Sequence, residues 1–280
     1  MPDEYVFLKG HGTENDFVLL PDHDGAVHGD LAAARVRALC DRRSGLGADG
    51  VLRVIRASVI DPPQAAAAEW FMDYRNADGG LSEMCGNGIR LFALHLAQEG
   101  LVDQSAPVPI ATRDGTKTVG FDGDLITVDL GQPRDLGETT VGVGGRTWTA
   151  RHVDMGNPHA VAFVDDLADA GTLLDVPAFD ATVYPHGVNV EFVVRRGADH
   201  VAMRVHERGV GETRSCGTGA GAVLVATALA DGRDAAHDGA GEAAYVVDVP
   251  GGRLGLTWTV DNRVLLTGPA VVVARGTTSL

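Results

Sequence analysis

Two apolar segments of helical length stand out along the chain, at residues 89–97 and 220–230. Both are apolar on nearly every side, which predicts helices that are enclosed within the protein. Each segment directly follows a cysteine and the pattern Gly-x-Gly, with the cysteines at positions 85 and 216. The pattern therefore predicts that each thiol lies at the start of a buried helix. A further helix is predicted at residues 31–43 from its apolar spacing.

Short apolar segments, separated by polar or glycine-rich turns, make up most of the remaining chain and predict strands. Residues 58–68 contain two adjacent prolines, which break any strand ladder, and predict a surface excursion. The predicted strands are residues 5–8, 16–20, 51–55, 70–74, 108–112, 116–120, 125–130, 147–153, 160–164, 188–194, 201–205, 245–249, 253–260 and 263–274.

The two halves of the chain repeat one order of elements. Asn76 lies nine residues before Cys85, and Glu207 lies nine residues before Cys216. This repeat predicts an α/β (α+β) fold of two pseudo-symmetric domains, each a curved, mainly antiparallel sheet or barrel around a central buried helix. The predicted domains are residues 1–128 and 129–264. Because the second half has more strands than it needs, residues 265–280 are predicted to return to the N-terminal half.

Composition narrows the range of partners. The chain has 280 residues, of which 45% are hydrophobic, and 38 acidic against 23 basic side chains give a formal charge of −15. Such a charge disfavours nucleic acid and anionic membranes, so a small-molecule substrate is expected. No leader sequence and no membrane-spanning run is recognisable, which predicts a cytoplasmic protein. Three cysteines are too few for a disulfide framework, and Cys40, outside the repeated pattern, is interpreted as a buried apolar residue.

The repeated cysteines suit acid–base chemistry. Unpaired N–H groups and a partial positive charge at a helix start favour a thiolate, and glycines let a carboxylate approach those N–H groups closely. One thiol from each half could remove a proton from one face of a carbon while the other delivers a proton to the opposite face. The scattered histidines and distant cysteines show no zinc spacing, so no metal site is predicted.

Six stretches carry a resemblance to a known family. They are KGHGTENDFVLL (9–20), RRSGLGADG (42–50), RNADGGLSEMCGNGIRLFA (75–93), DMGNPHAV (154–161), HGVNVEF (186–192) and ERGVGETRSCGTGAG (207–221). The sequence resembles the diaminopimelate epimerases, pyridoxal-independent cysteine enzymes of lysine and peptidoglycan biosynthesis, nearly from end to end.

The resemblance implies a site and an activity. It implies that Cys85 and Cys216 are catalytic, that no cofactor is needed, and that the substrate is diaminopimelate, with a homodimer as the candidate assembly. It implies that His159 and Glu207 tune the thiol pKa values. The implied substrate-binding residues are Asn15, Asn76, Gly86, Asn87, Asn157, Asn189, Glu207, Arg208, Gly217 and Thr218. The chain departs from many members at Gly50, where they carry glutamine, so that side-chain contact does not carry over.

Two other functions remain as alternatives. One is a racemase for proline, hydroxyproline or another amino acid, although Arg208 and the asparagines suit a substrate with polar groups at both ends. The other is a thiol redox or ligand-binding protein whose Cys85 and Cys216 cycle through a disulfide, which the absence of Cys-x-x-Cys disfavours. We expect oxidation to be able to join the two catalytic thiols and inactivate the enzyme. Taken singly, each of these residue types is also common in ordinary turns, cores or surface ion pairs.

Overall fold

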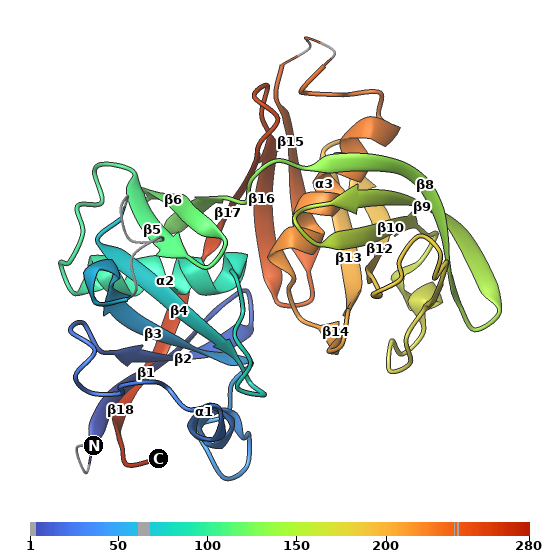
Figure 1. The fold of residues 1–280 in the computed structure, drawn as a ribbon. Helices are drawn as coiled ribbons and strands as arrows, with labels where there is room; N and C mark the ends of the chain where they lie inside the picture. Colours follow the sequence, from blue (N-terminus) through green and yellow to red (C-terminus); the bar gives the residue numbers. More distant parts are fainter. Residues whose placement is uncertain (1–3, 61–67, 238, 240) are drawn as a thin grey trace. The chain divides into compact units, whose positions relative to one another are not determined.

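The computed structural model describes residues 4–60, 68–237, 239 and 241–280. The chain forms two compact units, Met1–Val128 with Pro269–Leu280 (unit 1) and Asp129–Gly268 (unit 2). Each unit consists of a sheet and one long buried helix (Figure 1). Most of the excursion predicted at residues 58–68 lies outside the described residues. In the described part of the chain, no helix is both long and apolar enough to cross a membrane.

Unit 1 is built around α2 (Gly86–Gln98), whose side chains are buried along nearly the whole helix. The strand order is β18-β1-β2-β3-β4-β5-β6-β7, with parallel pairs only at β2–β3 and β4–β5. Figure 1 shows β18 running beside β1. The elements are β1 (Tyr5–Gly12), β2 (Asn15–Pro21), α1 (Ala33–Cys40), β3 (Gly50–Arg56), the 3-10 turn η1 (Ala57–Val59), β4 (Trp70–Asn76), α2, β5 (Val108–Thr112), β6 (Gly115–Asp122), β7 (Leu125–Asp129) and β18 (Val271–Thr278).

Unit 2 is built in the same way around α3 (Gly217–Ala230), which is composed almost entirely of small and aliphatic residues. The strand order is β8-β9-β10-β12-β13-β15-β16-β17, with parallel pairs only at β10–β12 and β13–β15. The elements are β8 (Arg134–Val143), β9 (Arg146–Asp154), β10 (Pro158–Phe163), the 3-10 turn η3 (Leu167–Ala170), β11 (Ala178–Phe179), β12 (Asn189–Gly197), β13 (His200–Glu207), β14 (Gly211–Thr213), α3, β15 (Ala243–Val249), β16 (Gly252–Trp258) and β17 (Val264–Pro269).

The two strand orders match step by step. In both units, two antiparallel pairs are followed by a parallel, an antiparallel and a parallel pair, and then by two antiparallel pairs. The cysteine helix enters at the same step, between β4 and β5 in unit 1 and between β13 and β15 in unit 2. The predicted fold class, two similar halves with a sheet around a buried helix, is confirmed.

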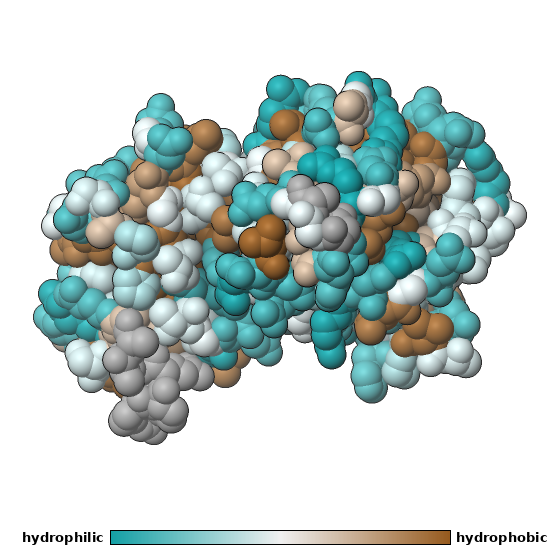
Figure 2. Space-filling view, turned by 90° about the horizontal axis from the view of Figure 1, so that it is seen from above, coloured by the Kyte–Doolittle hydropathy of each residue, from teal (hydrophilic) through white to brown (hydrophobic). Residues whose placement is uncertain are grey.

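Some elements differ from their predictions. The strand predicted at residues 263–274 is two strands, β17 and β18, because Pro269 has no N–H with which to continue a ladder. Strand β8 was not predicted, because most of its side chains are exposed and it lacks an apolar face. On the face seen in Figure 2, hydrophobic residues lie in small groups among hydrophilic ones, as the charge of −15 leads one to expect.

Candidate active site

Cys85 lies where the sequence predicted, at the start of the buried helix of unit 1. It is the N-cap residue of α2, with an extended backbone, and the Gly88 N–H donates a hydrogen bond to its Sγ at 3.4 Å. A helix start leaves several N–H groups without partners in the helix, and the thiol satisfies one of them. The side chain is neither fully buried nor fully exposed. The sulfur is therefore anchored to the start of the helix.

Two of the predicted asparagines meet beside this thiol. Sγ of Cys85 lies 3.4 Å from Asn15 Oδ1, and Asn87 Nδ2 donates to the same oxygen at 3.2 Å. The orientation of the Asn15 amide is fixed from the other side, where its Nδ2 donates to Asp49 Oδ2 at 2.8 Å. Asp49, which the sequence analysis did not assign to the site, thus determines that Asn15 presents an oxygen to the thiol.

Arg90 is a second residue that the sequence analysis missed. Its guanidinium is fully buried and donates to Asn87 Oδ1 at 3.0 Å and to the Gly86 carbonyl oxygen at 3.1 Å. Burial lowers the pKa of Arg90 to about 10, and the nearby Cys85 acts in the opposite direction. A single charged residue inside the apolar run 89–97 was the signal that could have indicated it.

Asn76 lies at the exposed end of β4, in register with Gly50 of β3. Among the described residues, its side-chain amide makes no hydrogen bond to the groups around Cys85. Gly50 has a steric reason to lack a side chain, because a Cβ there would lie 2.6 Å from the Arg75 carbonyl oxygen and 2.7 Å from Cε2 of Tyr74. A larger side chain here, such as glutamine, would require the backbone to shift.

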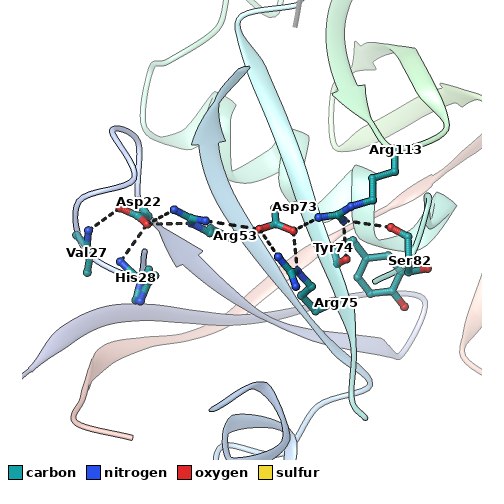
Figure 3. Close-up of polar contacts among 9 residues, drawn as sticks. All are labelled: Asp22, Val27, His28, Arg53, Asp73, Tyr74, Arg75, Ser82 and Arg113. Carbon is teal, nitrogen blue, oxygen red and sulfur yellow. Dashed lines mark hydrogen bonds and ion pairs between the residues drawn. The ribbon is translucent and has the colours of Figure 1, made fainter. Parts of the chain in front are cut away.

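A chain of ion pairs around the buried Asp73 supports the segment that leads to Cys85 (Figure 3). Asp73 on β4 accepts hydrogen bonds from Arg75 and Arg113, and Arg113 also donates to the backbone oxygens of Tyr74 and Ser82. Burial raises the pKa of Asp73, but the two arginines outweigh it and hold the pKa below its usual value. Because Ser82 lies three residues before the catalytic candidate, Arg113 fixes the approach to α2.

Cys216 occupies the equivalent position in unit 2. It is the N-cap residue of α3, and its Sγ accepts a hydrogen bond from the Gly219 N–H at 3.3 Å. The hydroxyl of Thr218 lies 3.6 Å from the same sulfur. Unlike Cys85, this residue is buried. The predicted placement of the second thiol at a helix start is confirmed.

Strand register gathers four polar residues on one face of the unit 2 sheet. His159 on β10 is in register with Asn189 on β12, and Glu191 on β12 is in register with Val205 on β13. Because side chains alternate along a strand, His159, Asn189, Glu191 and Glu207 point to the same side. An ideal Cβ at Gly219 would lie 2.8 Å from Glu191 Oε1, so this side of the sheet faces the start of α3.

His159 is held between two partners. Its Nδ1 lies 2.6 Å from Glu191 Oε1, and its Nε2 lies 3.0 Å from Asn157 Oδ1. Asn157 Nδ2 in turn donates to Thr218 Oγ1 at 3.4 Å. Glu191 was not among the predicted site residues. Its alternation with Asn189 in an otherwise apolar strand was the signal in the sequence that could have indicated it.

Asn189 and Arg208 meet at the end of β13. The Arg208 N–H donates to Asn189 Oδ1 at 3.0 Å, and Asn189 Nδ2 donates to the Pro158 carbonyl oxygen at 2.9 Å. The Arg208 side chain is exposed and has no ion-pair partner among the described residues. It is therefore available to an acidic group of a ligand.

The electrostatics of Cys216 differ from the expectation of a thiolate. Burial raises the pKa of the Cys216 thiol well above its usual value, and Glu207 and Glu191 raise it further. Burial likewise raises the pKa of Glu207, although hydrogen bonds from Thr213 and Cys216 oppose the shift. The Gly219 N–H and the Thr218 hydroxyl at the helix start lower the pKa of Cys216, as predicted, but burial and the two carboxylates outweigh them.

Cys40 belongs to neither of the two helix starts. It is buried at the end of α1, and burial raises the pKa of its thiol to about 11. Its interpretation as a buried apolar residue is confirmed. In the described residues, no group of three or more His, Cys, Asp or Glu side chains could hold a metal ion.

Comparison with known proteins supports the arrangement in both halves. The sequence profile of a family described as "Diaminopimelate epimerase" matches residues 7–136 and 151–273. The chain belongs to the diaminopimelate epimerase family. It is 56% identical over 282 residues to the diaminopimelate epimerase of Streptomyces coelicolor, covering 99% of this chain and 96% of the relative. It is 46% identical over 279 residues to that of Corynebacterium glutamicum, covering 96% of each.

Solved structures share the fold at low sequence identity. A Bacillus anthracis phenazine biosynthesis protein of the PhzF family superposes with a TM-score of 0.70 at 15% identity, covering 98% of this chain and 99% of the other. A hydroxyproline epimerase from Agrobacterium vitis, with bound trans-4-hydroxy-L-proline, gives 0.65 at 15% identity, covering 99% and 93%. These likenesses extend over both units and bear on the fold alone.

Proposed function

We propose that this chain interconverts LL- and meso-diaminopimelate by proton transfer at the α-carbon, as an epimerase of lysine and peptidoglycan biosynthesis that needs neither pyridoxal nor metal. The observation that carries the proposal is the pair of N-capping cysteines. Cys85 and Cys216 occupy the same position in two units of matching strand order. Membership of the diaminopimelate epimerase family supports the substrate.

The proposed reaction uses one thiol as base and the other as acid. In one direction of turnover Cys85 takes the α-proton as a thiolate and becomes a thiol, and the S–H of that thiol donates to Asn15 Oδ1. Cys216 starts as a thiol, gives its proton to the opposite face of the carbon and becomes a thiolate. Its burial beside Glu191 and Glu207 supports this starting form. The reverse turnover exchanges the roles, so protons balance over a full cycle.

The remaining predicted residues are proposed to bind the amino acid ends of the substrate. N–H groups at the start of α2 and α3 suit the carboxylate whose charge grows as the α-proton leaves. The exposed guanidinium of Arg208 suits a carboxylate, and Glu207 suits an ammonium group. Neutral amides such as Asn15 and Asn157 add hydrogen bonds without changing the net charge. A substrate that lacks polar groups at its far end would leave these partners unpaired.

The test is epimerisation of LL-diaminopimelate in heavy water. The native enzyme is expected to form the meso isomer with deuterium at the inverted α-carbon, and Cys85→Ala and Cys216→Ala are each expected to abolish this. Cys40→Ala, the matched control, should remain active because its thiol lies outside both helix starts. Native-like epimerisation by either of the first two variants would refute the two-thiol proposal. Turnover of proline or hydroxyproline in preference to diaminopimelate would favour a different amino acid racemase.

The proposal extends to the cellular compartment and to the oligomeric state. Both thiols must stay unoxidised for the reaction, which suits a reducing compartment such as the cytoplasm. A homodimer is proposed as the assembly, and light scattering during size-exclusion chromatography measures it directly.

A further inference from the structure

The pair formed by His159 and Glu191 is unusual for its burial. Both side chains have no exposed surface, and Nδ1 of the histidine lies 2.6 Å from Oε1 of the glutamate. Withdrawing two ionisable groups from water is unfavourable unless geometry and further hydrogen bonds compensate. Here Oε2 of Glu191 has no hydrogen-bond partner among the described residues. A pair kept at this cost, beside a catalytic candidate, calls for a role beyond packing.

A continuous line of contacts connects this pair to the thiol of unit 2. From Glu191 it passes through the imidazole of His159 to the amide of Asn157, with steps of 2.6 and 3.0 Å. The amide then donates to Oγ1 of Thr218 at 3.4 Å, and that hydroxyl lies 3.6 Å from Sγ of Cys216. Every link lies within unit 2, and the line ends on the atom that must gain and lose a proton.

We propose that Glu191 is a positioning residue: by holding His159, it sets the polarity of a hydrogen-bonded chain that ends at Sγ of Cys216. The inference rests on the proposed two-thiol function. Glu191 itself touches neither substrate nor the reacting carbon in this scheme. It acts through the ring that it holds.

The chain has two polarities because its middle links can both donate and accept. When both ring nitrogens of His159 carry hydrogen, Nε2–H donates to Asn157 Oδ1, and the amide NH₂ donates to Thr218. The Thr218 hydroxyl then directs its hydrogen at Sγ, which suits a thiolate. When Nε2 carries none, the amide turns over, Thr218 donates to it, and Oγ1 accepts the S–H of a thiol. No proton crosses the amide in either case.

Through His159, the carboxylate of Glu191 favours the first polarity, whereas its direct charge acts in the opposite sense and disfavours the Cys216 thiolate. A buried imidazolium requires a counter-charge, and Glu191 supplies it at hydrogen-bond distance. Other titratable groups also act on this region: Glu207 on β13, the Cys216 thiol on α3, and His152 on β9. Among the described residues, none of these three groups forms a hydrogen bond with the His159 ring, whereas Glu191 does. As Cys216 becomes a thiolate during turnover, the imidazolium form of His159 gives it a hydrogen-bond donor.

The test replaces the carboxylate by its neutral isostere, Glu191→Gln. ¹⁵N NMR of the histidine side chains at one fixed pH, with His159 assigned from His159→Asn, should show changed Nδ1 and Nε2 signals for His159, because Nδ1 exchanges a carboxylate partner for an amide. The value of kcat should fall roughly tenfold or more, while KM stays within about threefold, because the loss lies in proton transfer. The matched control is Glu212→Gln, a partly exposed carboxylate paired with Arg204 at 2.6 Å, which should change neither.

A second variant tests the other end of the chain. Thr218→Val removes the last hydroxyl, so kcat should fall while the ring ¹⁵N signals of His159 stay as in the native enzyme. The proposal is overturned if Glu191→Gln leaves the ring ¹⁵N signals of His159 and kcat unchanged, if Glu212→Gln shares the kcat loss, or if Thr218→Val keeps native kcat. Failure of the native enzyme to epimerise diaminopimelate would instead refute the proposed function, and the ring ¹⁵N signals of His159 would still report on the Glu191 contact.

Discussion

At the scale of the residue, a cysteine at a helix start experiences two opposing effects. The partial charge of a helix N-terminus stabilises an anion by about 0.3–1 kcal/mol, which is less than one pKa unit. Full burial shifts a pKa by several units in the opposite direction. At Cys216 burial is the larger effect, and the carboxylates of Glu191 and Glu207 add to it. The local sequence pattern thus locates the thiol correctly, but its environment determines the protonation state.

The effect of burial on a pKa can be measured at Glu207, which lies beside Cys216. Its pKa is raised in the folded protein, so the folded state binds more protons than the unfolded state at pH values just above the usual pKa. Its contribution to stability is therefore complete at low pH and is lost as pH rises through that interval. Glu207→Gln should melt at or above the native temperature at pH 8, while epimerisation falls by about 10² or more. Thermal melts at pH 5 and pH 8 check this, and a variant less stable at pH 8 would contradict it.

At the scale of the element, the two cysteine helices differ at their third residue. An added Cβ at Gly88 of α2 would make ordinary contacts at 3.4 Å with Cys85, Leu52 and Phe17. The same change at Gly219 of α3 would place a Cβ 2.8 Å from Glu191 Oε1 and 3.2 Å from Sγ of Cys216. One sequence motif therefore has two different steric environments.

Paired alanine substitutions exploit this difference. Gly88→Ala should be neutral or stabilise by up to about 1 kcal/mol, because alanine is the better helix former and space is available. Gly219→Ala should displace Glu191 and the thiol, and lower kcat much more than Gly88→Ala does. Denaturant unfolding and steady-state kinetics on both variants measure the contrast. Equal activity of the two would mean that the environment of Glu191 tolerates the added methyl group.

The sequence predicts elements well where the chain has a strong apolar pattern. Both cysteine helices begin at Gly86 and Gly217, directly after the thiols, as their apolar runs and Gly-x-Gly patterns indicated. The exposed strand β8 has no such pattern and was missed. Arg90, Asp49 and Glu191 were missed because their roles depend on which strand or helix lies next to them. Strand register, which places Glu191 beside His159, depends on long-range pairing and is not readable from local spacing.

At the scale of the whole molecule, two buried histidines make the stability of unit 1 depend on pH. In unit 1, burial lowers the pKa values of His28 and His95 to about 4 each. Neither ring has a hydrogen-bond partner among the described residues. Their folded-state pKa lies below the unfolded value of 6.5, so the stability they contribute is present above pH 6.5 and is lost as pH falls toward 4.

Unit 1 is therefore expected to be sensitive to acid. Each histidine should account for up to about 3 kcal/mol of the loss between pH 7 and pH 4. The double variant His28→Gln, His95→Gln should show a flatter pH dependence of the free energy of unfolding, measured with urea. Amide hydrogen exchange would locate the acid-induced opening in residues of unit 1. A double variant as pH-dependent as the native protein would show that carboxylates alone cause the loss.

The pairing of β18 with β1 has a consequence for biosynthesis. Unit 1 takes its edge strand from residues 271–278, which a ribosome makes after the whole of unit 2. Unit 2 is continuous in the chain, so it can fold completely before β18 has been synthesised. Unit 1, although translated first, cannot complete its sheet until then. The half that is translated first is thus the half that is completed last, and a ribosome that stalls after residue 268 leaves β1 with an open edge.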